Sequence, residues 1–293
     1  MGLLELVGLP ALMDRTEGSA DVSIGLVDGP VAAEHPELAR DRVRAIAGMI
    51  DAACARPDTG ACRHGTFVAG ILSALRTSAA PAICPGCTLL IRPVFAESSA
   101  RNDGMPVATP GQLATAISDC VAAGARVINL SLGLTRRSSQ GDQALEEVLN
   151  TAARRGVIVA AAAGSQGGSG TSALTRHQWV IPVTACDGRG MVLDGSHLDS
   201  STGRRGLRAP GHGVTSLSAT GGTFTAGGTS AAVAFVTGAV ALLWSEFPGA
   251  TATQIKLSIT QTGSPRRSVI PPLLDAASAR RVLAAASAGQ ESA

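Results

Sequence analysis

The chain has 293 residues, of which 45% are hydrophobic and 16% charged, so its composition is that of a folded globular protein with one large or two small domains. Its 24 basic and 22 acidic residues give a net charge of +2 that is spread along the chain, which argues against nucleic-acid binding. The longest apolar run, residues 231–244, is shorter than the about 20 residues that a bilayer requires, so we expect no membrane span.

Apolar, β-branched runs alternate with helical patterns along most of the chain, which predicts an α/β fold with a doubly wound, mostly parallel sheet. We expect strands over residues 22–28, 88–94, 126–131, 156–161 and 179–185. We expect helices over residues 65–75, 111–123, 143–154, 229–246 and 253–260. Between the last strand and Gly228 we expect short turns. We find no linker, and we expect the Ala/Ser-rich tail over residues 276–293 to add little to the core.

The cysteines bear on compartment and on metal binding. The N-terminal stretch has no basic segment of the kind that opens a signal peptide, so we expect a cytoplasmic location and mostly free, buried thiols. The alternative is a disulfide within the Cys54/Cys62 group or within the Cys84/Cys87/Cys120 group. A structural zinc site is disfavoured, because the C-x-x-C of Cys84 and Cys87 has no second ligand pair.

Three polar residues lie where an open α/β sheet directs side chains into a crevice. Asp28 ends a predicted strand, and His64 and Ser230 open predicted helices. Alone, Asp28 is more simply a turn residue, and His64 and Ser230 are more simply helix caps. Together, an Asp that orients a His and a His that takes the proton from a Ser are the minimal machinery for acyl transfer. The order Asp, His, Ser along the chain is one of the few known for this machinery.

The segments around these residues resemble the subtilisin-like (S8) serine proteases over roughly residues 1–262. Residues 22–28 (VSIGLVD) with 35–38 (HPEL), 63–70 (RHGTFVAG) and 228–238 (GTSAAVAFVTG) are similar to the aspartate, histidine and serine segments of that family. The resemblance implies a subtilisin-like three-layer α/β/α fold with a mostly parallel central sheet, and a peptidase domain over residues 1–275. It also implies that Ser230 is the nucleophile, His64 the general base and Asp28 the residue that orients the imidazole.

The resemblance also implies an oxyanion hole and a substrate groove. One oxyanion donor would be the backbone N–H of Ser230. The family has Asn at the next donor position, but this chain has Ser165 there, so Thr229 or Gln166 would have to substitute or activity would fall. The groove would bind the substrate as an added strand. Its lining residues would be Ser131, Leu132 and Gly133 of the segment VINLSLG, with residues 101–110 opposite, and Ala162, Ala163 and Gly164 of the segment VAAAAG.

The resemblance therefore implies a serine endopeptidase that acts on a peptide or protein substrate. Segments such as 82–90 (AICPGCTLL) are most similar to cyanobactin-type proteases, which implies processing of a ribosomal precursor peptide by leader removal. A catalytically weak or dead peptide-binding module on the same fold remains the alternative. A nucleotide-binding domain is disfavoured, because residues 164–170 do not match G-x-G-x-x-G. We expect no cofactor, no metal, and no nucleic-acid or membrane partner.

Overall fold

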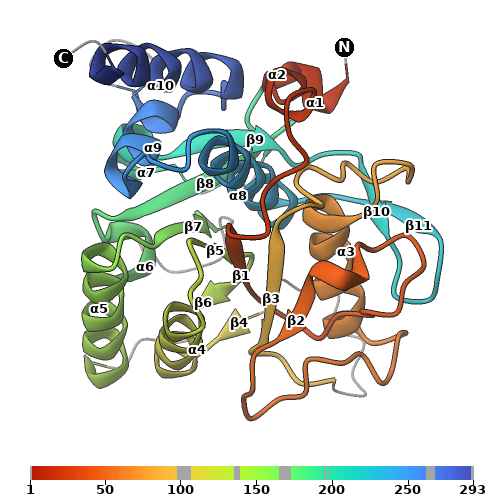
Figure 1. Ribbon diagram of the computed structural model, residues 1–293. Helices are drawn as coiled ribbons and strands as arrows, with labels where there is room; N and C mark the ends of the chain where they lie inside the picture. The colour runs from red at the N-terminus through yellow and green to blue at the C-terminus, as the bar shows by residue number, and fades with distance from the viewer. Residues whose placement is uncertain are drawn as a thin grey trace.

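A seven-stranded parallel sheet lies at the centre of the molecule (Figure 1), in the strand order β2-β3-β1-β5-β7-β8-β9. The structure is a computed structural model that describes residues 2–97, 107–134, 139–164, 173–194, 196, 198–261 and 268–291. The predicted mostly parallel sheet is confirmed. Its strands are β1 (Ser23–Asp28), β2 (Val43–Ala45), β3 (Thr88–Pro93), β5 (Val127–Leu130), β7 (Ile158–Ala162), β8 (Val180–Cys186) and β9 (Leu207–Pro210).

Helices cover both faces of the sheet and complete a three-layer α/β/α fold. Helix α8 packs on β5, β7, β8 and β9 and contacts α3, whereas α4 and α5 pack on each other across the opposite face. The helices of the layers are α3 (Gly60–Ser73), α4 (Pro110–Ala122), α5 (Ser139–Arg154), α8 (Thr229–Glu246) and α9 (Ala252–Thr260). Shorter or peripheral helices are α1 (Leu3–Leu6), α2 (Pro10–Met13), the 3-10 turn η1 (Arg40–Arg42), α6 (Ala173–Arg176), α7 (Ser200–Arg205) and α10 (Ala276–Glu291).

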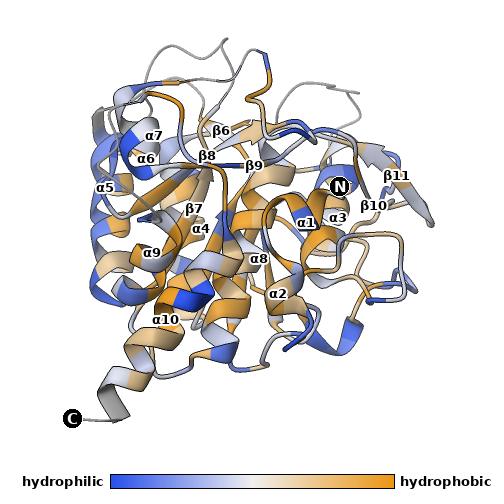
Figure 2. Ribbon diagram, turned by 90° about the horizontal axis from the view of Figure 1, so that it is seen from above, coloured by the Kyte–Doolittle hydropathy of each residue, from blue (hydrophilic) through white to orange (hydrophobic). Residues whose placement is uncertain are grey.

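The sheet separates two hydrophobic clusters, because the side chains of each strand alternate between its faces. One cluster joins α3 and α8 to the sheet, and the other joins α4 and α5 to it. Figure 2 shows the hydrophilic residues of α5 at the outer edge of the molecule. Helix α8 is long and apolar enough to cross a membrane, but 89% of it is buried inside the fold, as in a core helix. Helix α8 is the central helix of the hydrophobic cluster that also contains α3.

Two short strand pairs lie outside the main sheet. Strands β10 (Val214–Leu217) and β11 (Thr223–Ala226) form an antiparallel hairpin, and β4 (Val107–Ala108) pairs in parallel with β6 (Gly133–Leu134). The expectation of turns alone before Gly228 is therefore wrong, because α7, β9 and this hairpin lie there. Polar Thr and Ser side chains make up much of β10 and β11, which hides the apolar signal of a strand.

The C-terminal segment also differs from expectation. Residues from Ala276 onward form helix α10, and Ala276, Ala279 and Leu283 are 0%, 0% and 3% exposed in the α8-side cluster. The prediction that this segment adds little to the core is wrong. Small alanine side chains allow α10 to approach α2 and α9 closely, so a sequence that looks featureless packs well.

The cysteines divide into one disulfide and buried thiols. Cys54 and Cys62 form a disulfide, which was the alternative that the sequence left open. The four others are free and buried, as expected for most of the cysteines: Cys84, Cys87, Cys120 and Cys186.

Candidate active site

Asp28 ends β1 at the point where the chain reverses its direction across the sheet. From β1 the chain runs to β2 and β3 on one side, whereas from β5, the neighbour of β1 on the other side, it runs outward to β7, β8 and β9. Such a switch point opens a crevice at the carboxyl ends of the strands. The turn after Asp28 packs directly on α3, since a Cβ on Gly29 would lie 2.1 Å from the carbonyl oxygen of Ala61. Glycine is needed there for the two backbones to approach.

Helix α3 carries His64 to the same crevice. The helix begins at Gly60, where the side chain of Thr59 accepts a hydrogen bond from the N–H of Cys62. His64 therefore lies one turn inside the helix, and the prediction that it opens the helix is wrong. A Cβ on Gly65 would lie 2.5 Å from the carbonyl oxygens of Gly29 and Pro30, so α3 presses against the turn that follows Asp28.

Ser230 lies in the first turn of α8, as predicted. Helix α8 begins at Thr229, and Gly228 before it has φ of 107°, a left-handed conformation that favours glycine. The N–H of Gly228 donates a hydrogen bond to the carbonyl oxygen of Gly211 at 2.6 Å, which fixes the entry of the chain into the helix. The first N–H groups of a helix have no intrahelical partner, so those of the first turn of α8 are available for a ligand beside Ser230.

The β10–β11 hairpin links the helix of His64 to the segment of Ser230. Ser216 of β10 donates a hydrogen bond to the carbonyl oxygen of Phe67 in α3 at 2.7 Å. Phe224 of β11 packs on Phe67 with ring centroids 5.1 Å apart, and the guanidinium of Arg63 lies 5.5 Å from the ring of Phe224. Because β11 leads within a few residues into α8, these contacts set the position of the serine segment relative to the histidine helix.

The structure brings all three predicted residues within hydrogen-bond distance. Nδ1 of His64 lies 2.6 Å from Oδ1 of Asp28, and Nε2 of His64 lies 2.9 Å from Oγ of Ser230. The N–H of Gly29 also donates to Oδ1 of Asp28 at 2.7 Å. Asp28 is fully buried and the side chain of His64 is 20% exposed, so the imidazole closes the carboxylate off from solvent. The three side chains form one chain of hydrogen bonds from the buried carboxylate to the hydroxyl.

The electrostatic environment of His64 reflects this arrangement. Burial lowers the pKa of His64. The charge of Asp28 and its hydrogen bond to the ring raise the pKa by more than burial lowers it, so the net pKa is above the ordinary 6.5. The buried carboxylate therefore favours the imidazolium, which is the form that a histidine base reaches when it takes a proton.

A buried polar network supports Ser230 from behind, and the sequence analysis missed most of it. Oγ of Ser131 donates to the carbonyl oxygen of Ser230 at 3.0 Å and accepts from the amide of Asn129 at 2.8 Å. Oγ1 of Thr237, two turns further along α8, donates to Oδ1 of Asn129 at 3.0 Å. Asn129, Ser131 and Thr237 are all fully buried. The signal in the sequence was a polar residue within the apolar strand 127–130 and another within the apolar helix.

The predicted groove residues follow the ends of two neighbouring strands, β5 and β7. Ser131 and Leu132 are 0% and 1% exposed, and Ala162 and Ala163 are 5% and 8% exposed, whereas Gly133 and Gly164 are partly exposed. The Ser131 side chain faces the Ser230 backbone, so it braces the site instead of lining an open surface. Val107 and Ala108, expected opposite this segment, instead pair with Gly133 and Leu134.

Of the residues predicted to form the oxyanion hole, the structure describes the side chain of Thr229 but not those of Ser165 and Gln166. Thr229 is 6% exposed, and its Oγ1 has no hydrogen-bond partner among the described residues. Ser165, Gln166 and residues 101–106 lie outside the described residues.

The comparison with protein families agrees with this geometry. The family model described as the subtilase family, Peptidase_S8, matches residues 19–282. This chain belongs to the subtilase family. Its match covers every element that positions the three residues, from β1 to the first part of α10.

Known proteases are similar to this chain in sequence and in structure. Subtilisin amylosacchariticus of Bacillus subtilis subsp. amylosacchariticus is 29% identical over 261 residues, which is 87% of this chain and 64% of that relative. The chain thus spans less than two thirds of the length of this relative. A variant of the protease domain of PatA has a TM-score of 0.83 at 29% identity, covering 94% of this chain and 99% of that chain. The prenylagaramide maturation protease PagA has a TM-score of 0.80 at 26% identity, covering 94% and 98%. The predicted family and subtilisin-like fold are therefore confirmed.

Proposed function

We propose that this subtilase is a serine endopeptidase that hydrolyses peptide bonds through Asp28, His64 and Ser230. One observation carries the proposal: the imidazole of His64 lies 2.6 Å from the buried carboxylate and 2.9 Å from the serine hydroxyl. Those distances are within the range needed for proton transfer between nucleophile and base. The three residues also lie in the segments that match the family.

The reaction would proceed in two proton-coupled stages. Nε2 of His64 accepts the proton of the Ser230 hydroxyl as Oγ attacks the scissile carbonyl carbon, and the imidazolium then gives that proton to the leaving amine. Water hydrolyses the resulting acyl-enzyme with His64 again acting first as base and then as acid. Asp28 keeps the Nδ1–H tautomer in place and stabilises the imidazolium in both stages.

The tetrahedral intermediate would be stabilised at the N-terminus of α8. The N–H of Ser230 lies in the first turn, where the helix dipole favours negative charge. The buried hydroxyl of Thr229, which has no partner among the described residues, is the second donor in this proposal. A hydroxyl without a competing partner can turn toward a developing oxyanion at little cost.

Two observations support the proposal that the substrate is a precursor peptide. PagA is named a prenylagaramide maturation protease and PatA a patellamide maturation protease, and both superimpose over most of the chain. The segments after β5 and β7 carry the partly exposed Gly133 and Gly164, whose backbones can pair with an extended peptide. We therefore propose that the enzyme removes a leader from a ribosomal precursor peptide. We also propose a cytoplasmic place of action, which the four free cysteines support and the Cys54–Cys62 disulfide does not.

Labelling with a fluorophosphonate tests the catalytic assignment. The probe forms a covalent bond with a serine hydroxyl only when a neighbouring base activates it, so we expect labelling of the wild type and none of Ser230→Ala or His64→Ala. Tandem mass spectrometry should place the adduct on Ser230. A folded wild-type protein that fails to react would favour the alternative, a peptide-binding module without activity.

The substrate proposal needs a separate experiment. A library of peptides that resemble leader–core junctions is incubated with the enzyme, and the products are identified by mass spectrometry. Cleavage at one junction class, absent with Ser230→Ala, supports precursor processing. Unselective cleavage of unrelated peptides would leave the endopeptidase and remove the maturation role.

A further inference from the structure

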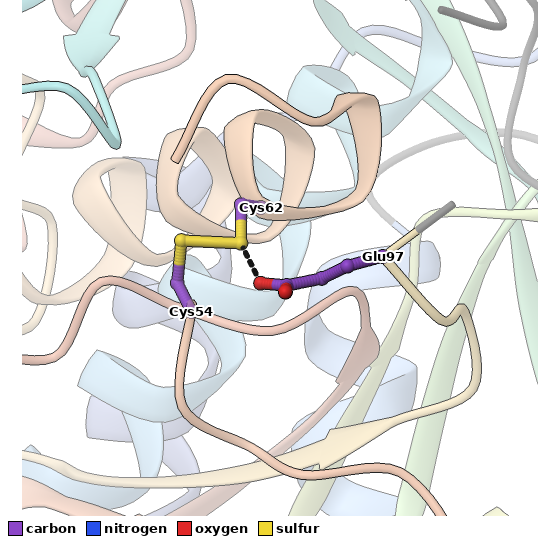
Figure 3. A group of neighbouring side chains, drawn as sticks. All are labelled: Cys54, Cys62 and Glu97. Atoms are coloured by element: carbon purple, nitrogen blue, oxygen red, sulfur yellow. Dashed lines mark hydrogen bonds between the residues drawn. A yellow bond between two sulfur atoms is a disulfide. The ribbon is translucent and has the colours of Figure 1, made fainter. Parts of the chain in front are cut away.

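A cluster of two cysteines and a carboxylate lies beside the histidine helix (Figure 3). Sγ of Cys54 and Sγ of Cys62 form the disulfide, and Oε1 of Glu97 lies 2.5 Å from Sγ of Cys62. The three ligand atoms all lie within 4.8 Å of one another. Cys54 comes from the loop before α3, Cys62 from the first turn of α3, and Glu97 from the segment that follows β3. None of the three takes part in the hydrogen bonds of the catalytic residues.

The Glu97 carboxylate is directed at the sulfurs by the loop that carries Cys54. Its Oε1 accepts hydrogen bonds from the backbone N–H groups of Ala55 at 2.8 Å and Arg56 at 3.1 Å, and Nε of Arg56 lies 3.9 Å from Oε2. A disulfide sulfur carries no proton to donate, so the disulfide gives this anionic oxygen nothing to bind on that side. The side chain is only 14% exposed, so solvent does not replace that partner fully. A proton or a metal cation between oxygen and sulfur would complete the arrangement.

The cysteines are placed to become metal ligands once the disulfide is reduced. Cys54 is partly exposed, which gives a reductant access to the bond, whereas Cys62 is fully buried. Cys62 lies at the third position of a 14-residue helix, and a helix N-terminus favours the thiolate over the thiol. Two thiolates and one carboxylate are a donor set that suits zinc.

We propose that Cys54, Cys62 and Glu97 form a thiol-dependent site for a divalent, thiophilic cation such as Zn²⁺. The disulfide and the metal are alternative occupants of the same place. An external thiol or phosphine reductant supplies two electrons and is itself oxidised, and the S–S bond becomes two thiols. When Zn²⁺ binds, each thiol loses its proton to solvent, and two Zn–S bonds and one Zn–O bond form, with a water as the fourth ligand.

The backbone permits both states without a large rearrangement. The Cα atoms of the two cysteines are 5.5 Å apart. The thiolate sulfurs of a tetrahedral zinc site stand about 3.8 Å apart, which side-chain rotation of the partly exposed Cys54 can provide. Either the disulfide or the bound metal ties the loop before α3 to the helix that carries His64. The reduced, metal-free protein lacks this link.

A cadmium titration tests the site directly. The wild type is reduced with a phosphine, freed of reductant under nitrogen, and titrated with Cd²⁺ while the ultraviolet thiolate-to-cadmium charge-transfer absorption is recorded. We expect one equivalent of Cd²⁺ to bind to the reduced protein and none to the oxidised protein. Zn²⁺ should displace it, and competition with a chromophoric chelator gives the Zn²⁺ affinity.

Variants assign the ligands. Cys54→Ser should abolish the absorption. Glu97→Gln should weaken Zn²⁺ binding by about tenfold to a hundredfold or more, since changes to residues around a metal site already cost that much affinity. Cys84→Ala, which breaks the buried Cys84/Cys87 pair, is the matched control and should leave the titration unchanged. His64→Ala should also leave it unchanged, which separates this site from the proposed catalytic residues.

Three results would overturn the proposal. The first is no charge-transfer band in the reduced wild type, which means that a proton alone occupies the site. The second is a band that Cys84→Ala removes, which places the metal at the buried pair. The third is a Zn²⁺ affinity that Glu97→Gln leaves unchanged, which removes the carboxylate from the ligand set. Each of these readouts is independent of peptidase activity, so failure of the catalytic assignment would not produce them.

Discussion

Replacing Asp28 with Asn separates the charge of this residue from its hydrogen bonds. Oδ1 accepts from both the N–H of Gly29 and the ring of His64, whereas Oδ2 is buried without a hydrogen-bond partner among the described residues. An asparagine can therefore keep its oxygen at the Oδ1 position and place its amide at the Oδ2 position. In that orientation the tautomer of His64 is preserved, and the main loss is the negative charge.

The size of that loss follows from the geometry. With the imidazolium charge at the ring centre and the carboxylate charge at its carbon, the charges are about 4 Å apart, which is worth about 4 kcal/mol at an effective dielectric constant of about 20. If the transition state carries the imidazolium, kcat/KM should fall about a thousandfold, since about 1.4 kcal/mol corresponds to a factor of ten. The buried amide adds a further cost, which should appear as lower stability.

The pH profile gives a second, independent readout. Catalysis requires unprotonated His64, so the acidic limb of kcat/KM follows the pKa of His64 in the free enzyme. In the wild type this pKa is raised above 6.5, so activity is lost as pH falls through a value above 6.5. In Asp28→Asn the burial that lowers the pKa remains and the carboxylate that raises it is gone. The acidic limb should therefore move to lower pH while the plateau falls.

The assay is kcat/KM for a cleaved peptide between acidic and mildly alkaline pH. Asp21→Asn, which removes a negative charge from an exposed position, is the matched control and should leave both quantities unchanged. A loss of activity below about tenfold, or an acidic limb that stays in place, would refute the role assigned to the carboxylate.

Three further substitutions test the surroundings of the site. Thr229→Val removes the hydroxyl without a partner and should lower kcat by about a hundredfold to a thousandfold with little change in KM, measured by steady-state kinetics; an unchanged kcat would exclude Thr229 as an oxyanion donor. Thr237→Val leaves the Asn129 carbonyl oxygen unpaired and should cost about 1–3 kcal/mol of unfolding free energy in urea, whereas a neutral effect would show that this hydrogen bond is dispensable. Gly65→Ala places a methyl group against two backbone carbonyl oxygens and should cost about 1–3 kcal/mol of unfolding free energy and lower kcat/KM, and wild-type values for both would refute the need for close contact between α3 and the turn that follows Asp28.

The sequence predicts the parallel sheet well because its central strands are buried on both faces. Residues 22–28 and 156–161 are almost continuously apolar, and the observed strands β1 and β7 agree with them within two residues at each end. The start of α3 was predicted five residues late, because Gly60 and the residues after it lack apolar periodicity. The helix begins there for a local reason, since Thr59 caps it and Cys62 is bonded to the preceding loop.

The catalytic residues and the polar network differ in how far sequence could reveal them. Asp28, His64 and Ser230 each follow a recognisable local pattern, so their spatial convergence could be inferred from the order of the motifs and the family resemblance. Asn129 and Thr237 belong to no such pattern, because each is a single polar residue within an apolar segment. Only the packing of α8 across β5 brings them together, and the sequence alone does not specify that register.

The network behind Ser230 explains why a fully apolar α8 would be a poorer scaffold for this site. Hydrophobic contact is non-directional, so packing through alanine and valine side chains sets the axial position of a helix less sharply than buried hydrogen bonds do. The hydrogen bonds from Thr237 to Asn129, and onward through Ser131 to the Ser230 backbone, have defined directions and are fully buried. A shift of α8 would leave these groups unpaired at about 1–3 kcal/mol each, so the network fixes the axial position of the helix and keeps the Ser230 hydroxyl within reach of His64.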